Sequence, residues 1–212
     1  MKPLAAMPAA VVKNIRGVFC DIDDTLTSEG KLTARAYAAL GRLRAAGKLV
    51  IPVTGRPAGW CDHIAPMSPT DAVVSENGAF YFYYDAARKK LAQRFLFDAV
   101  ARAANREKMI AVREHILREV PGCALASDQL YREADLAIDF CEDVPRLADT
   151  EVDRIVTLMR AAEMTAKINS IHVNGWFGDY DKLGMTCTLM QERYGVDLAQ
   201  YMLRAPDRRG RD

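Results

Sequence analysis

The sequence has no long apolar run and no excess of one charge. No stretch reaches the roughly 18 apolar residues that a membrane-spanning helix needs. The first 17 residues are interrupted by Pro3, Pro8 and Lys13 and lack the apolar core of a signal peptide. The 29 basic and 28 acidic residues give a formal net charge of +1, so no strongly basic surface is expected. We therefore expect neither a membrane nor a nucleic acid as a partner.

The cysteines and histidines lack the spacing of a disulfide framework or a zinc site. The five cysteines are widely scattered, form no CxxC pair and are odd in number. The three histidines, His63, His115 and His172, show no metal-ligand spacing. Together with the missing signal segment, this pattern favours reduced thiols and a cytoplasmic protein.

The apolar content that is present suffices for a packed interior. Half of the 212 residues are hydrophobic, and the chain contains no internal repeat and no low-complexity segment. A chain of this length and composition suits one large α/β domain, or a core with a smaller appendage.

Strand and helix patterns alternate over the first eighty residues. Apolar runs predict buried strands in GVFCDI, LVIPV and DAVVSENGA, the last with a turn at Asn77-Gly78. Between the first two strands, Thr33 can cap a helix that Gly47 closes. A second helix is expected around Trp60 and Ile64. This alternation predicts a parallel sheet covered by helices on both faces.

The middle of the chain follows another pattern, which suggests an α+β insert of roughly 90 residues. Its expected elements are a hairpin of AFYFYYD with AQRFLFD, a helix over 105–120, a strand LAIDF, a helix that begins with a capping-box-like Thr150 and Asp153, and a strand AKINSIHV. Beyond the insert, DKLGMTCTLMQERYG predicts a helix with Leu183, Thr186, Met190 and Tyr194 on one stripe, ending at Gly195.

Three polar clusters follow the predicted strands of the sheet. They are Asp21–Asp24, Thr54–Arg56 and Glu76–Gly78. Ligands of open parallel sheets bind at the carboxyl ends of the strands, so these clusters should converge in space.

The clustered residues fit phosphoryl transfer. An aspartate such as Asp21 can attack phosphorus, and Asp23, two residues on in an extended segment, can act as acid and then as base. The Thr54 hydroxyl and the Lys182 ammonium could hold the equatorial phosphoryl oxygens. A Mg²⁺ ion bound by carboxylates would offset their mutual repulsion and neutralise the substrate.

The motifs also resemble those of the haloacid dehalogenase superfamily, whose members are mostly Mg²⁺-dependent phosphatases. DIDDTLT resembles its DxDxT motif, VTGRP its second motif and DYDKLGM its lysine-bearing third motif. ENGA, from Glu76 to Ala79, is typical of the subgroup with a large cap between the second and third motifs (subfamily IIB). The matched segments run in order from about Val11 to Tyr194.

The resemblance implies a Rossmann-like core with an inserted α+β cap, as in sugar-phosphate phosphatases. We expect the core at 11–83 and 175–212 and the cap at 84–174. The resemblance also implies a small phosphorylated metabolite as substrate, with a sugar phosphate as one candidate. Among the residues that match, Gly55 joins Thr54 as a phosphate or substrate contact.

Several residues keep two interpretations. Arg56 is either a substrate contact or one half of a structural ion pair, and Asn77 is either a loop organiser or a substrate ligand. His172, Asn174 and Trp176 stand beside the predicted junction of cap and core, where both packing and substrate contact are open.

The fourth motif of the superfamily, which supplies a Mg²⁺-binding carboxylate after a further strand, has no clear counterpart. Only 30 of the 212 residues follow Lys182. The one candidate is a strand at 201–205 followed by Asp207 and Asp212, with Pro206 where glycine is expected. We expect a truncated or frame-shifted terminus, weak Mg²⁺ binding, and a sheet edge that lies open or is covered by a partner chain, which would favour a homo-oligomer.

The leading hypothesis is therefore a phosphatase-type hydrolase, with Asp21, Asp23 and Lys182 as catalytic residues and Asp21, Asp23 and Asp207 as metal ligands. An inactive protein that retains the fold is the alternative, because the fourth motif is missing. A signalling receiver also uses clustered aspartates, Thr and Lys around Mg²⁺, but that module is about half as long and has no cap.

Overall fold

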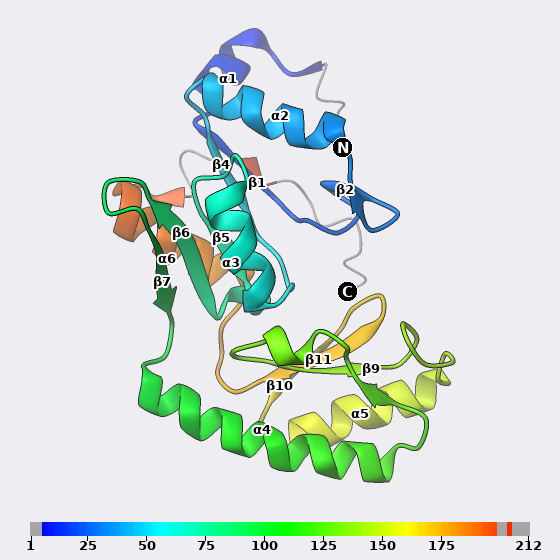
Figure 1. Ribbon diagram of the computed structural model, residues 1–212. Helices are drawn as coiled ribbons and strands as arrows, with labels where there is room; N and C mark the ends of the chain where they lie inside the picture. Colours follow the sequence, from blue (N-terminus) through cyan, green and yellow to red (C-terminus); the bar gives the residue numbers. More distant parts are fainter. Residues whose placement is uncertain (1–5, 199–202, 205–212) are drawn as a thin grey trace. The chain divides into compact units, whose positions relative to one another are not determined.

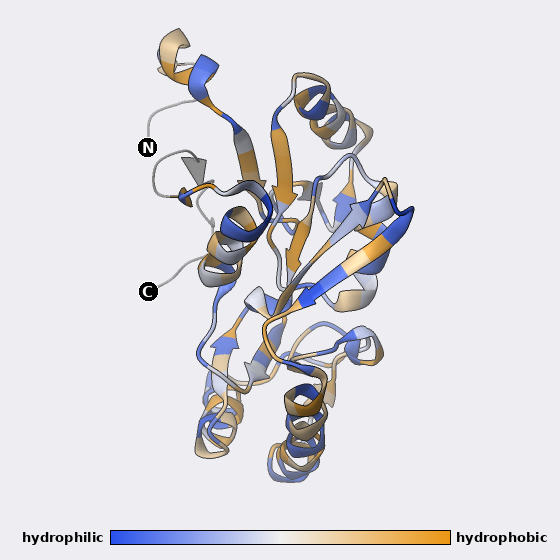
Figure 2. Ribbon diagram, turned by 90° about the vertical axis from the view of Figure 1, so that its left-hand side faces the viewer, coloured by the Kyte–Doolittle hydropathy of each residue, from blue (hydrophilic) through white to orange (hydrophobic). Residues whose placement is uncertain are grey.

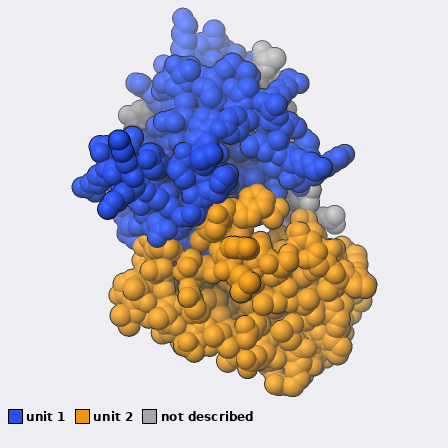
Figure 3. All heavy atoms as spheres, in the orientation of Figure 1, with its two compact units in different colours: residues 1–55, 61–94, 181–212 blue, residues 56–60, 95–180 orange. Residues whose placement is uncertain are grey.

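The chain divides into two compact units. The structure, a computed structural model, describes residues 6–198 and 203–204 (Figure 1). Unit 1 consists of residues 1–55, 61–94 and 181–212, and unit 2 of residues 56–60 and 95–180 (Figure 3). The expected core at 11–83 and 175–212 and the expected cap at 84–174 stay a prediction.

The sheet of unit 1 is parallel around its first strand. It has the order β12-β1-β4, formed by β1 (Gly17–Cys20), β4 (Leu49–Pro52) and β12 (Leu203–Arg204). Val18 lies opposite Val50 on one side and opposite Leu203 on the other, both in parallel register. A parallel bridge from Val53 to Val74 links β4 to β5 (Val73–Ser75). The parallel α/β sheet predicted from the sequence is confirmed, and a strand exists within the expected range 201–205.

Two further strands extend unit 1, in the order β5-β6-β7, and β6 pairs with β5 in antiparallel fashion. The turn η2 (Glu76–Gly78) joins β5 to β6 (Phe80–Asp85), and β7 (Lys90–Phe95) follows as the neighbour of β6. The predicted hairpin of AFYFYYD with AQRFLFD is confirmed, because β6 and β7 pair. A small ribbon of β2 (Thr27–Ser28) and β3 (Lys31–Leu32) follows the acidic loop.

The helices of the first part of the chain are α1 (Ala9–Asn14), α2 (Ala34–Ala45) and α3 (Ala58–Met67). As predicted, the Thr33 side chain caps α2 by accepting a hydrogen bond from Ala36 N. No helix among the described residues is long and apolar enough to cross a membrane.

Helix α6 (Lys182–Tyr194) covers the apolar side of the strands in unit 1. It ends at Gly195 in the left-handed conformation, as predicted. The core holds residues of β1, β4, β5 and β6 together with this helix: Phe19, Ile51, Val74, Tyr81, Met185, Leu189 and Met190. Figure 2 shows hydrophobic residues along the strands. Leu183, which was expected on the buried stripe, is 44% exposed, so the stripe begins one turn later than predicted.

Unit 2 is an antiparallel sheet with two helices. The sheet has the order β10-β11-β9-β8, formed by β8 (Ala124–Leu125), β9 (Leu136–Asp139), β10 (Thr165–Ile168) and β11 (His172–Trp176). Helices α4 (Ala99–Glu119) and α5 (Asp149–Ala161) contribute to an apolar core that includes Met109, Ile116, Ile138, Ile155, Met159 and Val173. All residues of this core come from a single stretch of the chain.

Three expectations for unit 2 are corrected. The stretch AKINSIHV is not one strand but the end of β10, a turn and the start of β11, because the Asn169 side chain accepts hydrogen bonds from Ile171 N and His172 N. Helix α5 begins one residue early, with Ala148 as N-cap, so Thr150 does not cap it. Helix α4 begins at Ala99, not at 105, because Asp98 caps it through Ala101 N.

Candidate active site

The acidic loop after β1 is fixed by a buried hydroxyl. Asp21 Oδ1 accepts a 2.7 Å hydrogen bond from Ile22 N. The Thr27 hydroxyl donates to Ile22 O and accepts from Asp24 N, both at 3.1 Å. Asp24 has a positive φ of 52°, which this bond helps to hold. Thr27 is a residue that sequence reasoning missed, because a single buried hydroxyl gives no pattern in the sequence.

Lys182 and Asp21 meet although 161 positions separate them in the chain. Lys182 Nζ donates to Asp21 Oδ2 at 2.7 Å, and both side chains keep about a quarter of their surface exposed. Lys182 is the first residue of α6, where Asp181 caps the helix by accepting from Gly184 N. A cation at the positive end of a helix is unfavourable by itself. The Asp21 carboxylate supplies the opposite charge there.

Thr54 leaves β4 beside the acidic loop. Val53 N donates to Cys20 O at 2.8 Å, so the ends of β1 and β4 remain hydrogen-bonded up to the two loops. Thr54 N donates to Val74 O at 2.9 Å, and the Thr54 side chain is fully buried. Because β1, β4 and β5 run parallel, their carboxyl ends lie at one edge of the sheet, where ligands of such folds bind.

The turn η2 completes this edge. Asn77 N donates to Thr54 O at 3.4 Å, and the Asn77 side chain lies beside Gly55, where an added Cβ would be 3.2 Å from Asn77 Oδ1. Asn77 has φ 56° and ψ 18°, the left-handed conformation of a turn former, which agrees with the loop-organising interpretation. Glu76 is buried completely, which no feature of the sequence indicated.

The structure thus assembles part of the predicted set within unit 1. Asp21 contacts Lys182, and Asn77 contacts both Thr54 and Gly55. Asp23 lies in the same loop as Asp21 and is partly buried.

The remaining predicted residues are not placed in this group. Arg56 belongs to unit 2, where its guanidinium lies 4.4 Å from the centre of the Trp60 ring. Asp207 and Asp212 lie outside the described residues.

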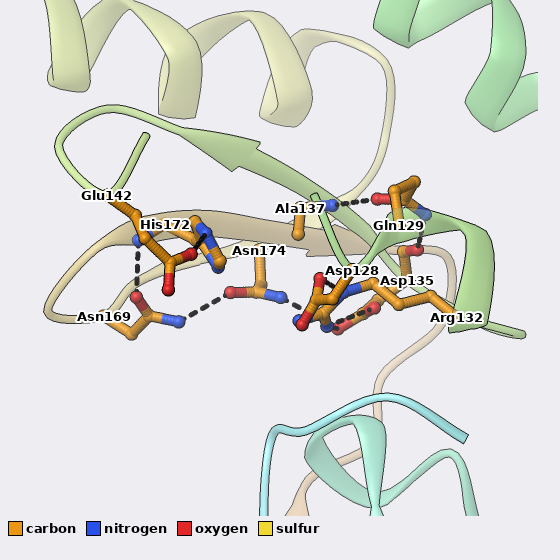
Figure 4. A network of polar contacts seen from close by, with 9 residues as sticks. All are labelled: Asp128, Gln129, Arg132, Asp135, Ala137, Glu142, Asn169, His172 and Asn174. Carbon is orange, nitrogen blue, oxygen red and sulfur yellow. Dashed lines mark hydrogen bonds and ion pairs between the residues drawn. The ribbon is translucent and has the colours of Figure 1, made fainter. Parts of the chain in front are cut away.

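A polar network runs through unit 2 (Figure 4). Arg132 forms ion pairs with Asp128 at 2.8 Å and Asp135 at 2.9 Å, and Asn174 Nδ2 donates to Asp135 Oδ2 at 3.0 Å. Asn169 Nδ2 donates to Asn174 Oδ1 at 2.8 Å. Burial tends to lower the pKa of Arg132, but the two aspartates raise it above its usual value. The sequence carried no periodic signal for this network, because all of these residues except Asn174, which lies in β11, come from turns and loops.

His172 and Trp176 are buried on β11 with Asn174. His172 Nε2 lies 2.8 Å from Glu142 Oε2, although this contact is not aligned as a hydrogen bond. The Trp176 ring stacks on Tyr180 at 5.6 Å between ring centres. These contacts give all three residues a packing role, and their substrate role stays a prediction.

Cys20, next to Asp21, is not a competing nucleophile. Burial, and after it the neighbouring Asp21 charge, raise the pKa of the Cys20 thiol to about 12. The thiol therefore stays protonated at neutral pH, whereas a reactive cysteine needs its thiolate.

The loop offers ligands of the kind that Mg²⁺ takes. Asp21 and Asp23 present hard carboxylate oxygens, and Mg²⁺ is commonly held by one or two carboxylates together with waters and phosphate oxygens. Within residues 6–198 and 203–204, no three His, Cys, Asp or Glu side chains gather as a metal site. The donor set of the described loop therefore fits a magnesium ion that completes its coordination with oxygens from other sources.

Part of the chain is similar to a known protein family. Residues 18–110 match a family model described as haloacid dehalogenase-like hydrolase. This match covers the first two motifs and ENGA, and it confirms the resemblance predicted from the sequence. Residues 18–110 are thus similar to haloacid dehalogenase-like hydrolases, and the fold of the chain agrees with this similarity. A search of curated protein sequences found no match.

Solved structures with the same fold include sugar phosphatases. A Thermoplasma acidophilum protein, 0175, aligns with a TM-score of 0.69 at 15% identity, covering 91% of this chain and 77% of that one. The sucrose-phosphatase of Synechocystis sp. PCC6803, solved with sucrose and phosphate, has a TM-score of 0.60 at 14% identity and coverages of 88% and 74%. A sugar phosphatase of haloacid dehalogenase subclass IIB aligns with a TM-score of 0.58 at 13% identity, covering 88% of this chain and 78% of that one. At these identities the likeness shows the fold, a core with an inserted cap.

Proposed function

We propose that the protein is a Mg²⁺-dependent phosphatase that hydrolyses a small phosphorylated metabolite through an aspartyl-phosphate. The observation that carries this proposal is the 2.7 Å contact between Asp21 Oδ2 and Lys182 Nζ at the carboxyl edge of the sheet. It joins a nucleophile to a cation that can stay in contact with the phosphoryl group, and phosphoryl transfer depends mainly on such positioning and charge.

In the first half-reaction, an Asp21 carboxylate oxygen attacks phosphorus, and the bond from phosphorus to the leaving oxygen breaks. Asp23 donates its proton to that oxygen. In the second, Asp23 takes a proton from water while the water oxygen attacks phosphorus, which releases phosphate and restores Asp21. Thr54 and Lys182 hold the equatorial oxygens, and Gly55, Arg56 and Asn77 contact the phosphate or the rest of the substrate.

Asp21 and Asp23 would hold Mg²⁺, with Asp207 as a further ligand. When bound, the ion neutralises negative charge on the substrate phosphate. Asp21 is oriented for its role before any ligand arrives, because Ile22 N and Lys182 Nζ each hold one of its oxygens.

The substrate we propose is a small metabolite, with a sugar phosphate as one candidate. The sugar phosphatases among the proteins of similar fold support this choice. We further propose residues 11–83 and 175–212 as the core and 84–174 as a cap that closes over the substrate. The five cysteines are free, which supports a cytoplasmic location.

The test is turnover of a generic aryl phosphate during titration with MgCl₂. We expect activity that saturates with Mg²⁺ and falls on the order of 10³-fold or more in Asp21→Asn. Asp24→Asn is the matched control, because it changes an exposed carboxylate in the same loop, and asparagine tolerates the positive φ there. It should keep its activity.

The opposite outcome would favour the inactive alternative. If the purified protein shows no Mg²⁺-dependent turnover and Asp21→Asn behaves like the parent, the phosphatase proposal is wrong for this chain. The same preparation, run on a sizing column, tests whether copies associate as a homo-oligomer.

A further inference from the structure

Three residues in a row take positive φ in the turn η2. The φ angles of Glu76, Asn77 and Gly78 are 42°, 56° and 107°. A fully buried glutamate rarely adopts this conformation, and such backbone persists only where the surrounding structure holds it. The turn therefore has a constraint beyond the reversal of the chain between β5 and β6.

The constraint is the beginning of α6. A Cβ added at Gly78 would overlap the carbonyl carbon and oxygen of Asp181, and it would lie 3.0 Å from Lys182 N. These are backbone atoms, which cannot rotate away as the end of a flexible side chain could. Asp181 also caps α6 through Gly184 N at 2.7 Å. Glycine at position 78 thus lets two backbones meet at the residue that precedes Lys182.

The other side of the turn contacts the loop after β4. Asn77 N donates to Thr54 O, and the Asn77 amide lies against Gly55. One turn therefore joins the loop of Thr54 and Gly55 to the helix that begins with Lys182.

We propose that the turn Glu76–Gly78 is a positioning element and that Gly78 is its key positioning residue. By setting where α6 begins, Gly78 holds the Lys182 ammonium at 2.7 Å from Asp21 and in a fixed relation to Thr54. Gly78 acts through Lys182 and touches no reacting atom. The catalytic part of this inference rests on the proposed phosphatase activity, and its structural part does not.

A simpler explanation is that Gly78 serves only the hairpin between β5 and β6. Substitution with alanine separates the two explanations when a second glycine serves as control. Gly47 has a similar need for positive φ, at 70°, but nothing lies within 4 Å of an added Cβ there. Both substitutions strain the backbone, and only Gly78→Ala pushes on Asp181 and Lys182.

The activity experiment measures kcat for an aryl phosphate with Mg²⁺ in both variants and in the Lys182→Ala background. We expect Gly78→Ala to lower kcat by about 10- to 100-fold, since a misplacement near 1 Å can cost on the order of 10²-fold. Gly47→Ala should stay close to the parent. In Lys182→Ala protein, Gly78→Ala should cause no further loss, because the two act as a unit. Equal losses with and without Lys182 would overturn the proposal.

A measurement without turnover tests the structural part. Hydrogen exchange of the backbone amides in the first turn of α6 should accelerate in Gly78→Ala but not in Gly47→Ala. If the parent protein lacks activity but this exchange difference is found, the proposed function fails and the positioning contact stands. If the two variants exchange alike, the positioning role is wrong whatever the activity.

If the Gly78→Ala protein does not fold, Asn77→Gly is the variant that tests the proposal. It adds no atom, loosens the turn and removes the amide beside Gly55. If the turn has a positioning role, Asn77→Gly should lower kcat severalfold. In the Lys182→Ala background, the same substitution should cause no further decrease in kcat. A lost substrate contact alone would raise KM in both backgrounds and would contradict it.

Discussion

At the scale of the residue, the acidic loop shows how a few side chains fix a charged turn. Asp21 is held through both carboxylate oxygens, by Ile22 N and by Lys182. Thr27 is 7% exposed, and its hydroxyl serves as donor and acceptor in the same loop. Removing one partner of a buried hydrogen bond leaves the other unsatisfied, which costs more than the bond itself contributes.

Thr27→Val should therefore destabilise the protein. We expect the free energy of unfolding, measured with urea, to fall by about 1 to 3 kcal/mol, because Asp24 N loses its hydroxyl acceptor and Ile22 O loses one of its several donors. Thr25→Val is the control at an exposed position two residues away, where a change within about 0.5 kcal/mol is expected. Equal effects of the two variants would show that the hydroxyl of Thr27 is not what orders the loop.

Asp139 gives a pH dependence. Burial acts to raise the pKa of Asp139, but hydrogen bonds from the N–H groups of Glu142, Asp143 and Cys141, together with the charge of His172, lower it below 3.8. A lowered pKa in the folded state means that the ionised form stabilises folding. This stabilisation is complete above pH 3.8 and is lost as the pH falls toward the lower folded-state pKa.

Asp139→Asn should consequently be less stable than the parent at pH 7, and the difference should shrink below pH 3.8. Urea unfolding of both proteins between pH 7 and pH 3 measures it. A difference that stays constant over this range would mean that the charge of Asp139 does not matter.

The residues of the candidate site were largely predictable, for a physical reason. Asp21, Thr54 and Asn77 each follow an apolar strand, and parallel strands bring their carboxyl ends together. Thr27 and Glu76 were not predictable, since a buried hydroxyl and a buried carboxylate leave no periodic pattern. Asp207 follows β12 in the sequence, but it lies outside the described residues, so its role as a ligand stays a prediction.

At the scale of the element, the sequence predicted helices and strands where one face is apolar. It predicted the ends of helices where a residue next to the helix caps it. The Thr33 cap and Gly195 mark the ends of α2 and α6 as expected. The turn between β10 and β11 escaped notice, because Asn169 makes it through side-chain hydrogen bonds inside a run that looks like one strand. The Asp98 cap, which begins α4 earlier than expected, was also missed, because it too is made by a side-chain hydrogen bond.

The loop around η3 (Gln129–Tyr131) depends on Arg132, whose side chain is 3% exposed. Arg132→Met would leave Asp128 and Asp135 without their cation, and breaking a buried ion pair costs about 3 to 5 kcal/mol of the free energy of unfolding. Arg113→Met is the control, because the Arg113–Glu114 pair is solvent-exposed and should contribute less than about 1 kcal/mol. Denaturant unfolding of both variants compares them, and a small loss for Arg132→Met would show that the network is dispensable.

At the scale of the whole molecule, the two units have separate apolar cores. The core of unit 2 runs from Met109 to Val173 without a contribution from elsewhere in the chain. The sequence anticipated an insert, since its pattern of elements differs from that of the flanking segments. The bounds expected for this insert, 84 and 174, stay a prediction.

A fragment of residues 95–180 should therefore fold alone. We expect a helical circular dichroism spectrum and a cooperative thermal transition. Ile155→Asp in the same fragment is the control, because it places a charge at a fully buried position and should abolish the transition. A fragment without cooperative melting would mean that unit 2 needs the rest of the chain.

The position of β1 between β4 and β12 has a consequence for the order of folding. Its partners come from near residue 50 and from residues 203–204, so the central strand can be completed only after unit 2 has been synthesised. Contacts between segments so far apart are slow to form, whereas the core of unit 2 is local. During synthesis on the ribosome, unit 2 can fold while β1 and β4 are already synthesised but still lack β12. We therefore expect the region that interrupts the fold in sequence to fold first.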